Sequence, residues 1–252
     1  MARAETRAIA LIIGLLLTPA LFAQQSFQYQ ASHPHPRGGG LGTLTINDVG
    51  VSFQEAYKNG RTPKHPHVWH WNYQDIQQLK IAPKSLTVLT YEDDKWKLGA
   101  DRSYQFDLVS DQTFEAAYNH LKSRLDQRFV AALAASPASV LWEIPVKHLV
   151  ALGGDEGVIQ VGPEEVMYKS AKPSESRTWR YEDIDNISSS GPFQLTITTF
   201  ERALMQYGSR KGFEFQLKQR LEEARYNDLW LRLNRTKGLS VLNSYRTAAA
   251  AQ

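Results

Sequence analysis

The sequence predicts a mainly β fold, a β-rich α+β class, in which one unit occurs twice in tandem. Three observations lead to this prediction. Short segments alternate apolar and polar residues between turn residues, a set of these segments recurs farther along the chain, and each copy ends in a stretch with apolar residues at helical spacing. Alternation is typical of half-buried strands, because successive side chains of a strand point to opposite faces.

The internal repeat is the most specific signal in the chain. The segment 71–76 recurs at 179–184, an offset of 179 − 71 = 108, and the segment 27–33 recurs at 142–148, an offset of 142 − 27 = 115. The two offsets differ because the loop after Phe53 is 115 − 108 = 7 residues longer than the loop after Tyr168. The repeated framework residues are Trp71, Tyr73, Asp75 and Ile76 in the first copy and Trp179, Tyr181, Asp183 and Ile184 in the second.

Seven strands are expected in the first copy, separated by turn residues such as Gly38–Gly40, Asn59-Gly60 and Pro83. Their approximate ranges are 27–33, 41–46, 50–56, 68–74, 76–81, 85–91 and 103–108. The second copy repeats this order, so each unit should form two packed antiparallel sheets.

A helix is expected to close each copy. Asp111 is a candidate N-cap, and apolar residues recur at helical spacing from Phe114 through Leu125 to Phe129, so the first helix should end before Pro137. The second helix is expected over 216–234. We therefore divide the chain into a first unit at 24–135, a second unit at 141–235 and a flexible tail at 236–252. The short linker between the units predicts that they touch.

The first 23 residues have the layout of a secretory signal peptide. Arg3 and Arg7 precede an uncharged apolar run that starts at Ala8, and a small residue, Ala23, offers a cleavage point. A retained membrane anchor is the alternative, but a span needs about 20 apolar residues. The run from 8 to 23 supplies 23 − 8 + 1 = 16 uncharged residues. We expect an exported protein, periplasmic or extracellular, cleaved after Ala23.

Composition narrows the function classes. The chain has no cysteine, so an exported form must be held together by core burial without disulfides. Its formal net charge of +3 falls to 27 − 25 = +2 without Arg3, Glu5 and Arg7. This gives no sign of the clustered basic face that a nucleic-acid-binding protein needs.

The strand order, the terminal helix and the W-x-Y-x-D-I segment resemble the pleckstrin-homology-like (PH-like) superfold, including bacterial PH-like and GRAM-type domains. The resemblance covers about 27–134 and 142–235. It implies two small barrels, each closed by a helix. It also implies a binding role toward lipid headgroups, peptides or proteins, among which a fold alone does not choose.

The loop before the second strand is a candidate ligand site. Arg37 beside Gly38, Gly39 and Gly40 combines a guanidinium with accessible backbone N–H groups, both of which suit a phosphate. PH domains that bind lipids carry basic residues in this loop. The second copy has an acidic sequence there, so a plain turn is the competing interpretation.

The histidines of the first copy are a candidate metal site. His33, His35, His65 and His67 form two pairs, and residues two apart on a strand share a face, as zinc or copper chelation requires. The prolines among them and the poor match in the second copy favour solvated loop histidines instead, and no cofactor is expected.

The acidic residues that recur in both copies are expected to have structural roles. Asp75 and Asp183 fit turn chemistry, in which the carboxylate bonds to a backbone N–H two residues on. Glu92 and Glu201 recur at 201 − 92 = 109 and could cap strand ends or form cross-strand ion pairs.

No G-x-S-x-G, H-E-x-x-H or Walker-type motif occurs in the sequence, and we predict no catalytic residue. The leading hypothesis is a non-enzymatic module that binds or scaffolds a protein or peptide. A module for a small anion or lipid headgroup and an enzyme with a dispersed site are the alternatives.

Overall fold

A computed structural model describes residues 25–34, 40–56, 66–95, 99–135, 139–150, 153–203, 210–235 and 237. The expected signal peptide, most of the expected tail, and the candidate residues His35, Arg37, Gly38, Gly39 and His65 lie outside this part of the chain. Within it, no helix has the length and apolar character needed to cross a membrane.

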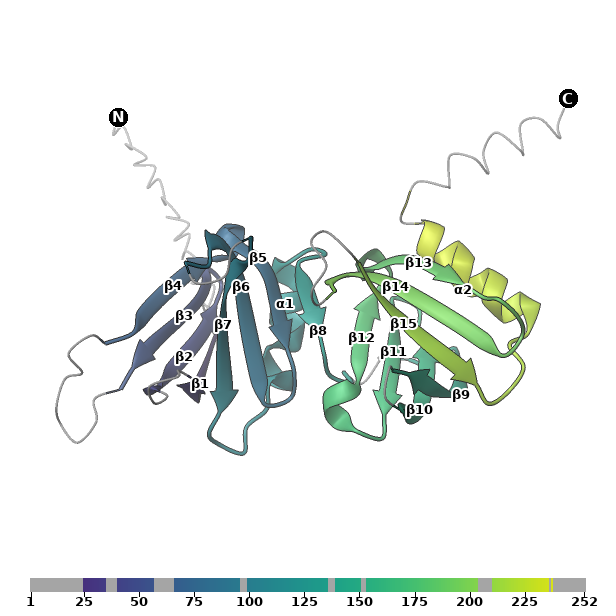
Figure 1. Ribbon diagram of the computed structural model, residues 1–252, viewed down its shortest axis with the longest axis horizontal. Helices are drawn as coiled ribbons and strands as arrows, with labels where there is room; N and C mark the ends of the chain where they lie inside the picture. The colour runs from purple at the N-terminus through teal and green to yellow at the C-terminus, as the bar shows by residue number, and fades with distance from the viewer. Residues whose placement is uncertain are drawn as a thin grey trace, which may run out of the picture.

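The first unit consists of seven strands, two short helical segments and a linking strand (Figure 1). The 3-10 turn η1 (Tyr73–Asp75) separates its fourth and fifth strands. The bounds of the other elements are β1 Ser26–His33, β2 Gly40–Asn47, β3 Gly50–Glu55, β4 Val68–Asn72, β5 Ile76–Ile81, β6 Ser85–Asp93, β7 Asp101–Leu108, η2 Phe114–Ala117, α1 Tyr118–Arg124 and β8 Phe129–Ala131.

The second unit repeats the seven strands and ends in a longer helix, α2 (Glu223–Arg235). Its strands are β9 Trp142–Leu149, β10 Gly154–Val161, β11 Glu165–Ser170, β12 Arg177–Arg180, β13 Ile184–Ser188, β14 Gln194–Arg202 and β15 Arg210–Leu217, with the 3-10 turns η3 Pro173–Glu175 and η4 Tyr181–Asp183 between them.

The strand order is the same in both units. Along the sheet the first unit reads β5-β6-β7-β1-β2-β3-β4 and the second reads β13-β14-β15-β9-β10-β11-β12, so the first strand pairs with the seventh in each. This confirms the mainly β, β-rich α+β class. The strands form one hydrogen-bonded sheet of 15 and not separate packed sheets, because the short β1–β7 and β9–β15 pairings join the two halves of each unit.

Buried apolar side chains form one cluster inside each unit. The repeated apolar residues belong to these clusters: Trp71 and Trp179 are 6% and 3% exposed, and Ile76 and Ile184 are 0% and 1% exposed. The tyrosine hydroxyls hold the turn between the second and third strands. Tyr73 donates to the Asn47 carbonyl at 2.7 Å, and Tyr181 donates to the Gly162 carbonyl at 2.7 Å.

Both helix predictions were wrong in their bounds. The first helix ends at Arg124, and Phe129, which fits the helical stripe, lies in strand β8 instead. The edge strands β5 and β12 come together at this point. Strand β8 pairs with both of them, so it satisfies backbone N–H and C=O groups of these edges that a longer helix would leave without partners. The second helix begins at Glu223, because Leu217 completes strand β15 and faces the core.

A glycine repeated in the two copies allows the second and third strands to approach closely. A Cβ at Gly42 would lie 2.6 Å from Phe53 and against the Gln54 carbonyl, and a Cβ at Gly157 would lie 2.6 Å from Tyr168 and against a backbone carbonyl. Overpacking of this kind in a core typically costs about 1–3 kcal/mol.

We therefore expect Gly42→Ala to lower the free energy of unfolding by about 1–3 kcal/mol in urea denaturation. Gly191→Ala is the matched control, since a Cβ there meets nothing within 4 Å. Its effect should stay within about 0.5 kcal/mol. Equal effects of the two substitutions would contradict the close-approach explanation.

Candidate functional site at the junction of the two units

Strand β8 joins the two units into one sheet. It runs parallel to β5, with Ile81 opposite Ala131, and pairs antiparallel with β12, where Thr178 lies opposite the same Ala131. The Thr178 hydroxyl donates to the Leu133 carbonyl at 2.9 Å and accepts from the Ala135 N–H at 3.0 Å. Figure 1 shows β8 and β12 side by side at the middle of the molecule. The junction is thus continuous secondary structure and not a loose linker.

Arg180 fastens the second unit to the end of helix α1. Its guanidinium donates to the carbonyls of Lys122 at 3.1 Å, Leu125 at 3.0 Å and Asp126 at 2.7 Å. The same side chain forms a two-pronged ion pair with Asp183, at 2.9 Å and 2.6 Å. The last carbonyls of a helix have no partner within the helix, so this cation from the other unit supplies one.

A second contact between the units lies beside the first. Glu165 of β11 accepts hydrogen bonds from the Tyr118 hydroxyl at 2.9 Å and the Lys122 ammonium at 2.8 Å. Burial, followed by the nearby Glu165 charge, raises the pKa of Tyr118, so its hydroxyl stays protonated and remains a donor. Both contacts hold the two units in one orientation.

An irregular strand pairing brings Glu201 into this junction. The β14–β15 register shifts between Thr199 and Arg202. The Glu201 N–H donates to the Thr199 hydroxyl at 3.3 Å, which itself donates to the Lys211 carbonyl at 3.2 Å. Such bulges commonly redirect a side chain. Here the redirected side chain is the Glu201 carboxylate, which is 5% exposed.

The first unit has the same local structure with a different outcome. Glu92 donates its N–H to the Thr90 hydroxyl at 3.4 Å, and that hydroxyl donates to the Arg102 carbonyl at 3.2 Å. Yet the Glu92 side chain is 61% exposed. The repeated local structure therefore positions the glutamate in both units, and contact with the neighbouring unit determines whether its carboxylate is buried.

Three cations surround the Glu201 carboxylate, one from the first unit and two from the second. Lys80 and Lys211 donate to Oε1 at 3.1 Å and 3.2 Å, and Arg177 donates to Oε2 at 3.3 Å. Burial alone would raise the pKa of Glu201, but the charges of Arg177, Lys80 and Lys211 outweigh it and lower that pKa to about 2. Burial lowers the pKa of Lys211, against the opposing influence of Glu201.

An open pocket of about 520 Å³ lies in front of this cluster. Five cations lie in or beside it, against three carboxylates, so the described groups carry an excess of 5 − 3 = 2 positive charges. The cations are Lys80, Arg177, Arg202, Arg210 and Lys211, and the carboxylates are Asp101, Asp185 and Glu201. The remaining lining residues are Gln78, Thr87, Ala203 and Gly212. A pocket of this size and charge suits an anionic ligand.

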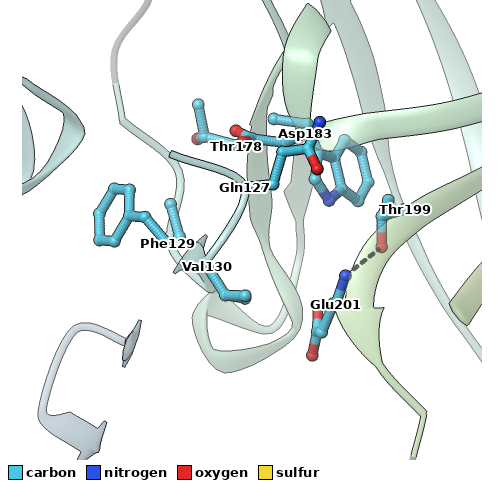
Figure 2. Close-up of a pocket in the computed structure, with 9 residues that line it drawn as sticks. Gln127, Phe129, Val130, Thr178, Asp183, Thr199 and Glu201 are labelled. Atoms are coloured by element: carbon cyan, nitrogen blue, oxygen red, sulfur yellow. Dashed lines mark hydrogen bonds between the residues drawn. The ribbon is translucent and has the colours of Figure 1, made fainter. Parts of the chain in front are cut away.

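A much smaller void lies on the inner side of Glu201. Its volume is about 10 Å³, roughly the space that one water molecule needs. Figure 2 shows Phe129 and Val130 of the linking strand on one side of it and Thr199 and Glu201 on the other. Trp179 also lines it, and its indole N–H has no hydrogen-bond partner among the described residues. This void is too small for a ligand, so the open pocket is the candidate site.

Of the four candidate residues of the loop before the second strand, the structure describes only Gly40, where β2 begins. Of the candidate metal ligands, His33 and His67 have ring centroids 5.9 Å apart and pack on Trp69, each at 4.8 Å. The His67 imidazole lies 3.4 Å from the Glu55 carboxylate. Among the described residues, no group of three or more His, Asp or Glu side chains is placed to hold a metal ion.

The two repeated aspartates form local bonds, but these are not the expected bonds to a backbone N–H two residues on. Asp183 accepts from the Arg180 N–H at 2.9 Å, and Asp75 accepts from the Asn72 side chain at 2.9 Å. The partner lies three residues before the aspartate and not two residues after it. A 3-10 turn lies between the two partners in each unit and brings residues three apart in sequence close together.

Sequence reasoning missed the junction pocket as a site. It paired Glu92 with Glu201 and proposed cross-strand ion pairs, and Lys211 of the adjacent strand is such a partner of Glu201. Lys80 lies 201 − 80 = 121 residues away, and nothing in the sequence brings it to Glu201. Only the packing of the two units does so.

No protein-family model matches the chain, and no curated protein does. Among solved structures, it is similar to the C-terminal domain of an unknown protein from Leishmania infantum, at 13% identity over 48% of this chain and 94% of that chain, with a TM-score of 0.30. It is also similar to the Spt16D Pob3N heterodimer, at 12% identity over 70% of this chain and 83% of that chain, with a TM-score of 0.27. Similarity at this level identifies no family, and the chain is defined by its own topology: two seven-stranded units in one sheet.

Proposed function

We propose that this protein is an exported, non-enzymatic tandem of bacterial PH-like, GRAM-type units that binds a protein or peptide at the junction of the units. The observation that carries the proposal is the open pocket with two excess positive charges, lined by Lys80 of the first unit and Lys211 of the second. A ligand seated there contacts both units at once. In this proposal the signal peptide is cleaved after Ala23, and the mature chain acts in the periplasm or outside the cell.

The fixed junction favours a scaffold over a catalyst. Arg180, Thr178 and Glu165 hold the units together through bonds to backbone and side chains. The described lining of the pocket contains no histidine or serine that could act as a base or nucleophile.

A free small anion or lipid headgroup is the second candidate ligand, and the same excess of positive charge in the pocket favours it.

Site-specific photo-crosslinking in the native cell tests the proposal. A benzoylphenylalanine at Gly212 points into open space at the pocket, since a Cβ there meets nothing within 4 Å. The matched control is the same substitution at Gly191, which is equally open but does not line the pocket. We expect a protein-sized adduct from position 212 that is absent from position 191 and is lost when Lys80→Glu is added. No adduct at 212, or equal adducts at both positions, would refute a partner site at the junction.

A further inference from the structure

We infer that the occupant of the junction pocket is an acidic peptide segment, one carboxylate of which bridges the ammonium groups of Lys80 and Lys211. This inference rests on the proposed function, because it names the partner chemistry of the same pocket. It concerns two lysines on different units whose amines converge on one point.

The convergence follows from their shared acceptor. Both amines donate to the same oxygen, Oε1 of Glu201, at 3.1 Å and 3.2 Å. Each ammonium carries three donors, so each retains donors that this bond does not use. A second carboxylate oxygen can therefore be received by both amines together.

The exposed fractions give the direction of approach. The Lys80 and Lys211 side chains are 36% and 33% exposed, while the Glu201 side chain is 5% exposed. The amines thus lie at the open side, with the resident carboxylate behind them. An incoming carboxylate meets the amines first and does not displace Glu201.

The charge balance leaves this position attractive to an anion. One carboxylate, Glu201, is shared among Lys80, Lys211 and the buried Arg177. At a partly desolvated position the uncompensated positive charge raises the energy of the unoccupied site. Burial lowers the pKa of Lys211, and the nearby Arg177 and Lys80 charges add to this effect against the opposing influence of Glu201.

The arginines of the pocket are already engaged by resident groups, so the two lysines carry the recognition of the ligand. Arginine forks hold carboxylate and phosphate alike through two parallel donors. Here Arg202 already donates to Asp101 at 2.7 Å and Gln77 at 2.8 Å, and Arg210 is ion-paired with Asp185. The two lysines act as point charges and can donate together to a single carboxylate oxygen.

The size and walls of the pocket favour a peptide segment over a single small anion. A volume of about 520 Å³ exceeds what one carboxylate fills. Gln78 and Thr87 supply neutral donors and acceptors along the wall formed by the first unit, and these suit a peptide backbone.

Isothermal titration of the purified protein with four probes tests the inference. The probes are hexaglutamate, hexaglutamine, inorganic phosphate and phosphatidylglycerol vesicles. We expect hexaglutamate alone to bind, with an affinity that falls steeply as salt rises. Phosphate or vesicle binding without hexaglutamate binding would overturn the inference and assign the pocket to a phosphate-bearing ligand.

Lysine variants locate the binding in the pocket. Lys80→Gln and Lys211→Gln should each weaken hexaglutamate binding about fivefold, as expected for the loss of one partly exposed ion pair. Lys169→Gln removes an exposed lysine of β11 outside the pocket lining and should leave the affinity unchanged. Thermal melts identify any variant that fails to fold. Equal weakening by all three would show nonspecific charge attraction and refute the site.

The two proposals fail in distinguishable ways. A crosslinked partner at position 212 together with absent hexaglutamate binding leaves the partner site standing and refutes the acidic segment. Hexaglutamate binding sensitive to Lys80 and Lys211, without any crosslinked protein, supports the carboxylate chemistry and refutes a protein partner in the cell.

Discussion

Replacing Arg180 with methionine is expected to lower the free energy of unfolding by about 3–5 kcal/mol, the usual cost of removing one partner of a buried ion pair. The substitution leaves the Asp183 carboxylate, which is 9% exposed at the residue level, without its guanidinium. It also removes the donors to three carbonyls around the end of helix α1, at Lys122, Leu125 and Asp126. Methionine keeps most of the side-chain volume, so the effect reports lost polar contacts.

The repeat supplies a matched control for this substitution. Asn72 occupies the equivalent position of the first unit, at 180 − 72 = 108, and its amide donates to Asp75 in an exposed pair. Asn72→Ala should cost less than about 1 kcal/mol, because water replaces the lost bond at an exposed position. Urea denaturation monitored by tryptophan fluorescence measures both variants. Comparable losses would show that Arg180 acts only within its own turn and does not fasten the two units.

Most of the strands could be predicted from the sequence, because the alternation of apolar and polar residues and the internal repeat both reflect burial within each unit. The expected strand at 76–81 coincides with β5, and that at 103–108 lies within β7. Each of these segments buries alternate side chains against its own unit. Local periodicity is sufficient for such elements, since their partners lie nearby in the same repeat.

Features that depend on the contact between the units could not be predicted in the same way. Leu125 and Phe129 are four residues apart and fit a helix, yet Phe129 lies in a strand because the β5 and β12 edges meet there. Glu92 and Glu201 have the same local hydrogen bonds, but only Glu201 is covered by the other unit. A repeat in the sequence shows what two copies share and not how one packs on the other.

Glu201→Gln is the second substitution with a large expected effect, a loss of about 3 kcal/mol in the free energy of unfolding at neutral pH. A neutral amide cannot compensate Arg177, which is 4% exposed, nor the adjacent amines of Lys80 and Lys211. Glu92→Gln is the equivalent change in the first unit, where the side chain is 61% exposed. It should cost less than about 1 kcal/mol, the upper range for a surface ion pair.

The pH dependence separates lost charge from altered packing. The Glu201 pKa is about 2 in the folded protein against an ordinary value of 4.5. A group whose pKa is lowered by folding contributes stability above its unfolded pKa, and that contribution is lost as pH falls through the folded pKa. The difference of 4.5 − 2 = 2.5 corresponds to about 3 kcal/mol.

We therefore expect the stability gap between wild type and Glu201→Gln to be full above about pH 5 and to shrink toward pH 2. Urea denaturation at pH 7, 4 and 2.5 measures this gap, with Glu92→Gln as the reference for general acid effects. The carboxylate is faced by Lys80 from β5, Arg177 from β12 and Lys211 from β15. Protonation of Glu201 is therefore the titration that closes the gap, and a gap that did not change with pH would assign the loss to packing and refute the charge cluster as a source of stability.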